Sequence, residues 1–212
     1  MFKNRRSFIK KGATAAIATS ALFNSPFQND PCGTKTALSE ENIIGPKEGY
    51  TPHVGALVSM MNWMRSTILR PVEGLSIAEL DYLHDENSNS IGAMLWHLAA
   101  TERFYQLNTL DGKDWGDWPA ADSKEFDVAM SLGNTGRKEI KGYSLDFYME
   151  KLDRVRNHSL EELKKKDDTW LLEPDESWFW GPTNNYCKWF HVVEHESNHN
   201  GQIKYIKSRV EV

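Results

Sequence analysis

Three histidines spaced four residues apart lie near the end of the sequence, in the segment HVVEHESNHNGQIK (residues 191–204). On a helix this spacing places His191, His195 and His199 on one face, where neighbouring imidazole rings can reach a common point. The segment also contains the pattern H-E-x-x-H, which in zinc proteases supplies two metal ligands and a general base. The spacing therefore points to metal chemistry, and the pattern names one candidate class of enzyme.

The helix face that carries these histidines is predicted to be buried, because Val192, Ile203 and Ile206 share it. Buried neutral imidazoles without partners leave polar groups unsatisfied, and buried charged imidazoles cost more. A divalent metal resolves this problem because it takes one nitrogen from each ring. Core histidines bonded to backbone or carboxylate groups are the alternative, but three histidines in register favour a metal site.

The residues after the motif argue against a protease. Proteases of this class take their third metal ligand from downstream, and only thirteen residues, none of them histidine, follow His199. The extended form of the motif would need glycine and histidine where Gln202 and Tyr205 stand. The third ligand is therefore expected upstream. His97 is the natural donor, because it lies on the flank of the apolar face of another predicted helix.

Four helical segments are expected to position these side chains, and no segment shows the alternation expected of strands. The helices are predicted over about residues 51–70, 88–109, 144–166 and 184–209. Their expected starting residues are Thr51, Ser88 or Ser90, Ser144, and Asn184 or Asn185. The connectors 110–143, with one short helix expected around 126–130, and 167–183 are long. The predicted fold class is therefore all-α: a four-helix bundle with a long crossover connection between the second and third helices.

The first 23 residues differ in kind from the rest, and residues 1–31 are assigned to an export signal and the start of a linker. Arg5 and Arg6 are followed by Phe8-Ile9-Lys10 and then by an uncharged Ala/Thr-rich run, which resembles a twin-arginine export signal. The start of a basic amphipathic helix is the alternative. Residues 32–49 are predicted to be a flexible linker and residues 50–212 the folded domain. The resemblance implies export to the periplasm or the medium, with a membrane tether if the signal is not cleaved.

Composition narrows the class of protein further. Hydrophobic residues make up 40% of the sequence and charged residues 26%, as in folded proteins. Residues 32–212 hold 20 Lys and Arg against 29 Asp and Glu, a net charge of −9, which disfavours nucleic-acid binding. Two cysteines, Cys32 and Cys187, provide no disulfide framework. Residues 12–23 form a run too short for an ordinary transmembrane helix, and no later run is long enough.

Two blocks of sequence, NSIGAMLWHLAATERFYQ and WFHVVEHESNHNGQIKYI, together resemble the DinB-like superfamily of metal-binding four-helix bundles. The resemblance covers about residues 50–209. It implies that His97, His195 and His199 hold a divalent metal, with Zn²⁺ and Ni²⁺ favoured, and that His191 lies beside the site. The sequence departs from the family pattern at Asn200, where arginine is common, and in its enlarged connector between the second and third helices.

The same resemblance implies an activity. Characterised DinB-like proteins include thiol S-transferases that use bacillithiol or mycothiol, thiol-dependent isomerases, and domains of thiol-histidine biosynthesis enzymes. The metal would bind a small thiol and lower its pKa, or would activate water for hydrolysis. By analogy the chain is expected to form a homodimer. A metal-binding or stress-response protein without catalysis is the alternative, and a helical interaction domain with structural histidines is a third.

Further residues receive expected roles near the metal. Glu196 is either a general base at the mouth of the site or an exposed helix residue. Glu102, on the inward face of the second helix, is expected to orient a ligand imidazole from outside the coordination sphere. The enzyme hypothesis predicts a cleft beside the metal, with Trp96, Trp178 or Trp180 as candidate lining residues.

Overall fold

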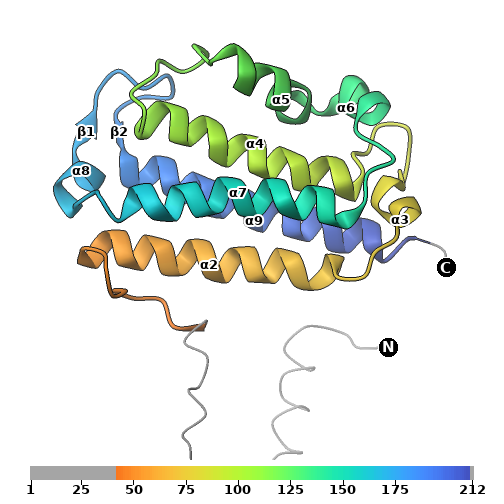
Figure 1. The fold of residues 1–212 in the computed structure, drawn as a ribbon, viewed down its shortest axis with the longest axis horizontal. Helices are drawn as coiled ribbons and strands as arrows, with labels where there is room; N and C mark the ends of the chain where they lie inside the picture. The colour runs from red at the N-terminus through yellow and green to blue at the C-terminus, as the bar shows by residue number, and fades with distance from the viewer. Residues whose placement is uncertain (1–41, 211–212) are drawn as a thin grey trace, which may run out of the picture. The chain divides into compact units, whose positions relative to one another are not determined.

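The computed structural model describes residues 42–210, and these residues are predominantly helical. Four long helices lie side by side (Figure 1). They are α2 (Pro52–Val72), α4 (Ile91–Thr109), α7 (Leu145–Leu163) and α9 (Asn185–Lys207). The all-α prediction is thereby confirmed. The predicted export signal and most of the predicted linker lie outside the described residues.

The two long connectors contain more regular structure than the sequence suggested. The first carries α5 (Ala120–Ser131) and α6 (Gly133–Glu139), where one short helix was expected, and α5 packs on α4 because it buries Phe126 and Ala129. The other short elements are α3 (Ile77–Asp81), α8 (Asp168–Leu172), β1 (Pro174–Asp175) and β2 (Thr183–Asn184). β1 and β2 pair antiparallel over two residues each, too short a run for alternation to show in the sequence.

Side-chain caps fix where the site helices begin. Ser90 caps α4 by accepting a hydrogen bond from the Ala93 amide, and Asn184 caps α9 in the same way, so both expected starts are confirmed. The start of α2 differs, because the Thr51 side chain makes no such bond. Asp168, at the start of α8, accepts from the first-turn amides of α2 instead. A cap supplied from another helix could not be seen in the local sequence.

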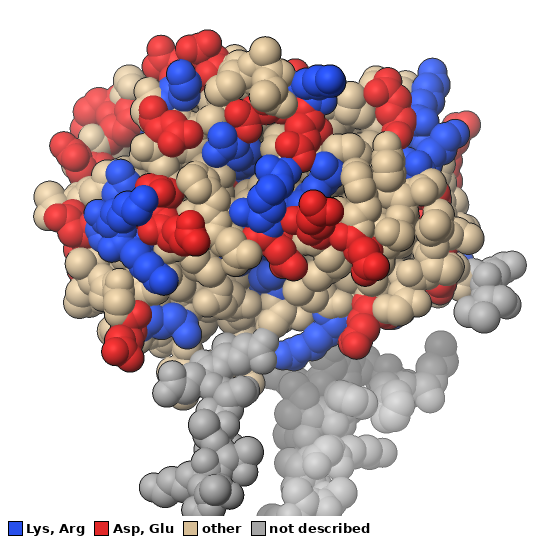
Figure 2. All heavy atoms as spheres, in the orientation of Figure 1, with Lys and Arg blue, Asp and Glu red and all other residues tan. Residues whose placement is uncertain are grey.

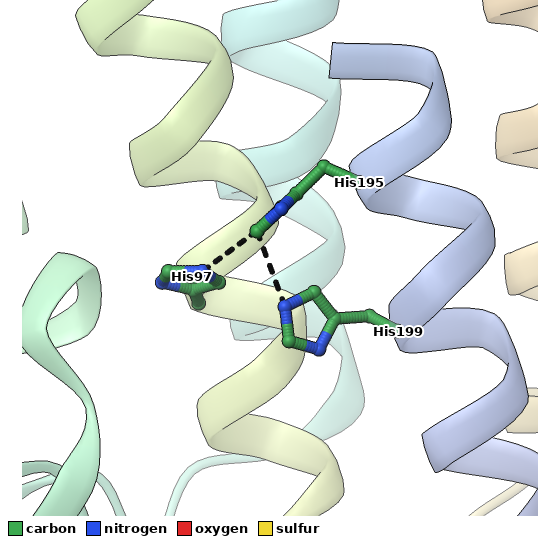
Figure 3. A group of neighbouring side chains, drawn as sticks. All are labelled: His97, His195 and His199. Atoms are coloured by element: carbon green, nitrogen blue, oxygen red, sulfur yellow. Dashed lines mark hydrogen bonds between the residues drawn. The ribbon is translucent and has the colours of Figure 1, made fainter. Parts of the chain in front are cut away.

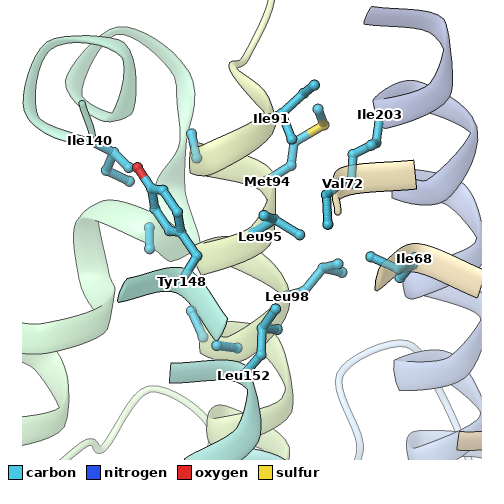
Figure 4. Packing of buried hydrophobic residues seen from close by; sticks show 14 of the residues in the cluster. Ile68, Val72, Ile91, Met94, Leu95, Leu98, Ile140, Tyr148, Leu152 and Ile203 are labelled. Atoms are coloured by element: carbon cyan, nitrogen blue, oxygen red, sulfur yellow. The ribbon is translucent and has the colours of Figure 1, made fainter. Parts of the chain in front are cut away.

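The core surrounds α4, which is buried on most of its circumference. Figure 4 shows side chains of α4 packed against side chains from the other three long helices. The contacts across this region include Met94, Leu95 and Leu98 of α4 with Leu152, Ile68 and Ile203. Gly92 lets α7 approach closely, because a Cβ at this position would lie 2.6 Å from the Tyr148 ring. This packing sets α4, and with it His97, against α9.

Charges of both signs are interspersed on the molecular face shown in Figure 2, with no extended area of one sign. Charges of opposite sign also pair between helices, as Lys151 of α7 does with Glu125 of α5 at 2.7 Å. No helix within residues 42–210 is both long and apolar enough to cross a membrane.

Candidate metal centre

Helices α4 and α9 bring three predicted ligands together. His97 comes from α4, and His195 and His199 come from successive turns of α9 (Figure 3). The Nε2 atom of His195 lies 2.8 Å from Nε2 of His97 and 3.2 Å from Nε2 of His199. All three rings thus direct the same nitrogen to one point, and the three potential ligand atoms lie within 4.8 Å of one another.

The tautomer of His97 is set by a backbone carbonyl. Its Nδ1 atom lies 2.9 Å from the carbonyl oxygen of Ala129 in α5. Because a carbonyl oxygen can only accept, Nδ1 carries the proton, and Nε2 presents a lone pair to the other two rings. Burial also lowers the pKa of His97, which favours this neutral form.

The other two rings are also neutral at neutral pH. Burial, with smaller contributions from neighbouring histidines, lowers the pKa of His195 to about 3 and that of His199 to about 4. His199 Nδ1 is buried without a hydrogen-bond partner among the described residues. Neutral imidazoles whose Nε2 atoms meet at 2.8–3.2 Å need a proton or a cation between them.

These residues fit a divalent cation. In a tetrahedral site with metal–nitrogen distances of about 2.0–2.1 Å, the nitrogens lie roughly 3.3 Å apart. The two separations from His195 Nε2, 2.8 and 3.2 Å, are close to this value. Three protein nitrogens leave coordination positions for other ligands, as catalytic sites do. His195 is only half-buried, whereas His97 and His199 are buried, so the open side lies near His195.

Glu196 lies in a buried group of charges. Its side chain is 1% exposed, so the expectation of an exposed glutamate is wrong. Its Oε1 atom accepts hydrogen bonds from Arg65 of α2 at 2.6 and 2.8 Å and from Arg156 of α7 at 3.0 Å. These ion pairs give no support to a role as general base, which stays a prediction.

Glu102 belongs to the same group. Its carboxylate accepts from Arg65 at 2.8 Å, from Arg156 at 2.8 and 3.0 Å, and from Ser159 at 2.7 Å. Burial raises the pKa of Glu102, but the two arginine charges outweigh it and leave that pKa below its usual value. Glu102 was expected to orient a ligand imidazole. For His97, the Ala129 carbonyl oxygen orients the ring instead.

We name Arg65, Glu102, Arg156 and Glu196 the buried charge cluster. Each comes from a different long helix, so the cluster ties all four together. Sequence reasoning missed both arginines. The sequence did contain a signal for them. Arg65 lies four positions after Met61, and Arg156 lies four positions after Leu152, so each arginine shares the apolar face of its helix.

His191 lies beside the three converging histidines. Its ring centroid is 5.5 Å from that of His195, and its Nδ1 atom lies 3.0 Å from the hydroxyl of Tyr105. It is not among the histidines whose nitrogens converge. On its other side the ring meets Trp180, at a centroid distance of 5.7 Å.

The three tryptophans expected to line a cleft beside the metal lie in different parts of the structure. Trp180 is 45% exposed and adjoins His191, and Trp178 is buried behind it. Trp96 instead packs edge-on against the stacked rings of Tyr143 and Phe147.

A cavity of about 580 Å³ lies further along α9, between this helix and the segment 84–89. Its lining is mostly polar: His84, Asp85, Asn87, Ser88, Asn89, Asn198, Gly201, Gln202, Tyr205 and Ile206. The cavity lies close to the metal centre along the chain, because Asn198 and Gln202 line it and His199 lies between them on α9.

The comparisons with known proteins agree with this geometry. The sequence model of the mycothiol S-transferase family matches residues 56–211. The chain belongs to this family. Mycothiol S-transferases are DinB-like proteins, so the resemblance to the DinB-like superfamily is confirmed. None of the curated proteins compared with this sequence matches it.

A solved structure shows the same fold. The crystal structure of an uncharacterised protein from Clostridium difficile 630 aligns with a TM-score of 0.57 and 14% sequence identity. The alignment covers 74% of this chain and 97% of the other. At this identity the likeness supports the all-α fold of this member of the mycothiol S-transferase family.

Proposed function

We propose that this chain is a small-thiol S-transferase that depends on a divalent cation, Zn²⁺ or Ni²⁺, held by His97, His195 and His199. The observation that carries the proposal is the convergence of three Nε2 atoms, two pairs of them at 2.8 and 3.2 Å. Membership of the mycothiol S-transferase family supports the substrate class.

The protein's own residues prepare the site for such chemistry. The Ala129 carbonyl holds the His97 ring in the tautomer that can donate a lone pair. Burial keeps His195 and His199 uncharged at neutral pH, so each ring retains one unprotonated nitrogen that can bind a cation. When bound, the cation supplies a Lewis acid that lowers the pKa of a thiol and makes it nucleophilic near neutral pH.

The 580 Å³ cavity supports the binding of a polar thiol. Asn198, which precedes His199 in α9, and Gln202 line it, and it offers amide and hydroxyl groups such as those of Asn198 and Ser88. A thiol attached to a hydroxyl-rich or amide-rich carrier could place its carrier here and its sulfur at the histidines. This cavity favours an enzyme over a protein that only stores metal, because storage needs no adjoining cavity.

Export is a separate proposal that rests on the sequence alone, in which Arg5 and Arg6 precede Phe8-Ile9-Lys10 and an uncharged Ala/Thr-rich run. We propose that the twin-arginine signal sends the folded, metal-loaded protein to the periplasm or the medium. Replacing both arginines by lysine should retain the protein in the cytoplasm, as fractionation with an antibody would show. Unchanged export of this variant would contradict the proposal.

The activity is tested by measuring consumption of a free thiol in the presence of an electrophile. The full chain loaded with zinc should consume mycothiol faster than the chelator-treated chain and faster than the His195→Ala variant. Mycothiol turnover that is equal in all three samples would contradict metal-dependent transfer. Bound zinc without thiol turnover would leave the non-catalytic alternative.

A further inference from the structure

The hairpin between β1 and β2 lies at the end of the helical bundle where α9 begins (Figure 1), and it carries an aromatic surface. Phe179 and Trp180, at its tip, are 66% and 45% exposed. Both contact the buried Trp178, with ring centroids 4.7 and 5.1 Å away, and each other at 5.1 Å. Large aromatic side chains exposed together are unusual on a surface without a binding role.

The aromatic tip is firmly anchored. The ammonium group of Lys188, in α9, lies 4.0 Å from the centre of the Trp178 ring. The same group pairs with Asp175 of β1 at 2.7 Å, and Lys188 is itself buried. Trp115 packs against Trp178 from the long connector at 5.3 Å. The exposed rings are therefore held in a defined place, as a binding surface requires.

This surface leads to the metal centre. The Trp180 ring lies 5.7 Å from His191, and His191 lies 5.5 Å from His195. A single imidazole thus separates the exposed aromatic rings from a proposed metal ligand. The polar cavity is lined by α9 residues from Asn198 to Ile206, so the cavity and the aromatic surface lie toward opposite ends of α9 from the centre.

The hydrogen bond with Tyr105 determines which ring nitrogen of His191 carries the hydrogen. The Tyr105 hydroxyl is buried, and burial raises its pKa, so it keeps its proton. His191 Nδ1, 3.0 Å away, is the acceptor that satisfies this proton. In the neutral ring the other nitrogen, Nε2, then carries a hydrogen. His191 therefore presents a hydrogen-bond donor rather than a metal-binding lone pair.

We propose that Phe179, Trp180 and His191 form the subsite for the second substrate, an aromatic electrophile with a leaving group that accepts a hydrogen bond. The proposal rests on the proposed function. The rings of the tip would stack on the electrophile, and Nε2–H of His191 would donate to its leaving group. Aromatic stacking favours flat apolar molecules over small aliphatic ones.

The transfer step balances without a further reactant. The thiol loses its proton to solvent, and the sulfur uses an electron pair to form a bond to the electrophilic carbon. The bond from this carbon to the leaving group breaks, and the leaving group departs with its electron pair. A hydrogen bond from His191 Nε2 stabilises the charge that develops there. The products are a thioether and the released anion, with no change of oxidation state in the protein.

The proposed subsite is tested by measuring the binding of an aromatic molecule that cannot react. The probe is 1,3-dinitrobenzene, a flat molecule without a leaving group, titrated calorimetrically into the zinc-loaded full chain. Trp180→Ala should raise its dissociation constant about tenfold, the effect of losing one stacked ring together with its buried area. Trp63→Ala is the matched control, because Trp63 is also exposed, at 37%, and bonds to Asn42 away from the tip. Equal affinities for wild type and Trp180→Ala would overturn the proposal.

A second readout separates this subsite from the thiol chemistry. With 1-chloro-2,4-dinitrobenzene as electrophile, Trp180→Ala should raise KM about tenfold and His191→Phe should lower kcat. With iodoacetamide, a small aliphatic electrophile, Trp180→Ala should raise KM less than it does with 1-chloro-2,4-dinitrobenzene. Trp180→Ala could weaken dinitrobenzene binding even though the wild-type protein transfers no thiol. That result would overturn the proposed function and leave an aromatic binding site. A Trp180→Ala variant that changes oligomeric state but not dinitrobenzene affinity would assign the tip to a protein interface instead.

Discussion

Replacing Arg156 by methionine would leave two buried carboxylates facing a single guanidinium group. Arg156 donates to Glu102 at 2.8 and 3.0 Å, to Glu196 at 3.0 Å, and to the Met61 carbonyl at 2.7 Å. After the substitution only Arg65 would balance the charge of the two glutamates. Methionine has a similar length and is apolar, so the main change is the loss of charge and of hydrogen bonds.

The expected cost follows from the burial of the cluster. Glu102 and Glu196 are 0% and 1% exposed, so solvent does not compensate for the lost partner. Removing one member of a buried ion pair costs about 3–5 kcal/mol of unfolding free energy. That is a large part of the roughly 5–15 kcal/mol that a typical domain has in total. Arg154→Met, two residues earlier on α7, should cost only about 0–1 kcal/mol, because that arginine is 51% exposed.

Urea unfolding followed by circular dichroism measures both changes. The full chain is compared in the presence of a chelator, so that metal binding does not alter the apparent stability. Adding Glu102→Gln to Arg156→Met should restore part of the loss, because it removes the unbalanced charge. An Arg156→Met variant no less stable than Arg154→Met would refute the view that the cluster ties the four helices together.

Two further outcomes follow from the structure. Gly92→Ala should destabilise the protein by about 1–3 kcal/mol, because the new methyl group would meet the Tyr148 ring at 2.6 Å. Gly201→Ala should stabilise the protein by roughly 0.5–1 kcal/mol, because Gly201 lies in α9 with open space around it. If urea unfolding shows that both substitutions stabilise the protein, or that both destabilise it, the packing described is contradicted. In the folded protein the pKa values of His195 and His199 are about 3 and 4, below the ordinary value for histidine. Just below that ordinary value, the unfolded chain therefore binds more protons than the folded chain. The metal-free protein should therefore lose stability as the pH falls from about 7 to about 5, and a flat profile over that range would refute their burial as neutral rings.

The sequence predicted the long helices well because their signals are local. Apolar stripes and capping residues such as Ser90 and Asn184 lie within the helices that they define. The convergence of His97 with His195 and His199 was also predicted, since the family resemblance linked two blocks about a hundred residues apart.

The missed features depend on contacts between distant residues. Asp168 caps a helix that begins over a hundred positions earlier, and the Ala129 carbonyl orients His97 from a different helix. Glu196 was expected at the surface or at the site mouth because its buried partners, Arg65 and Arg156, were not recognised. Such pairings are set by tertiary packing, which no single segment encodes.

The metal content of purified protein tests the central claim most directly. Inductively coupled plasma mass spectrometry of the full chain, after supplementation with zinc or nickel, should find about one ion per chain. His97→Ala and His195→Ala should each lose nearly all of it. His191→Ala, which changes a histidine one turn away on the same face, should retain it. Wild-type protein without metal, or a His97→Ala variant that keeps its metal, would contradict a centre formed by His97, His195 and His199.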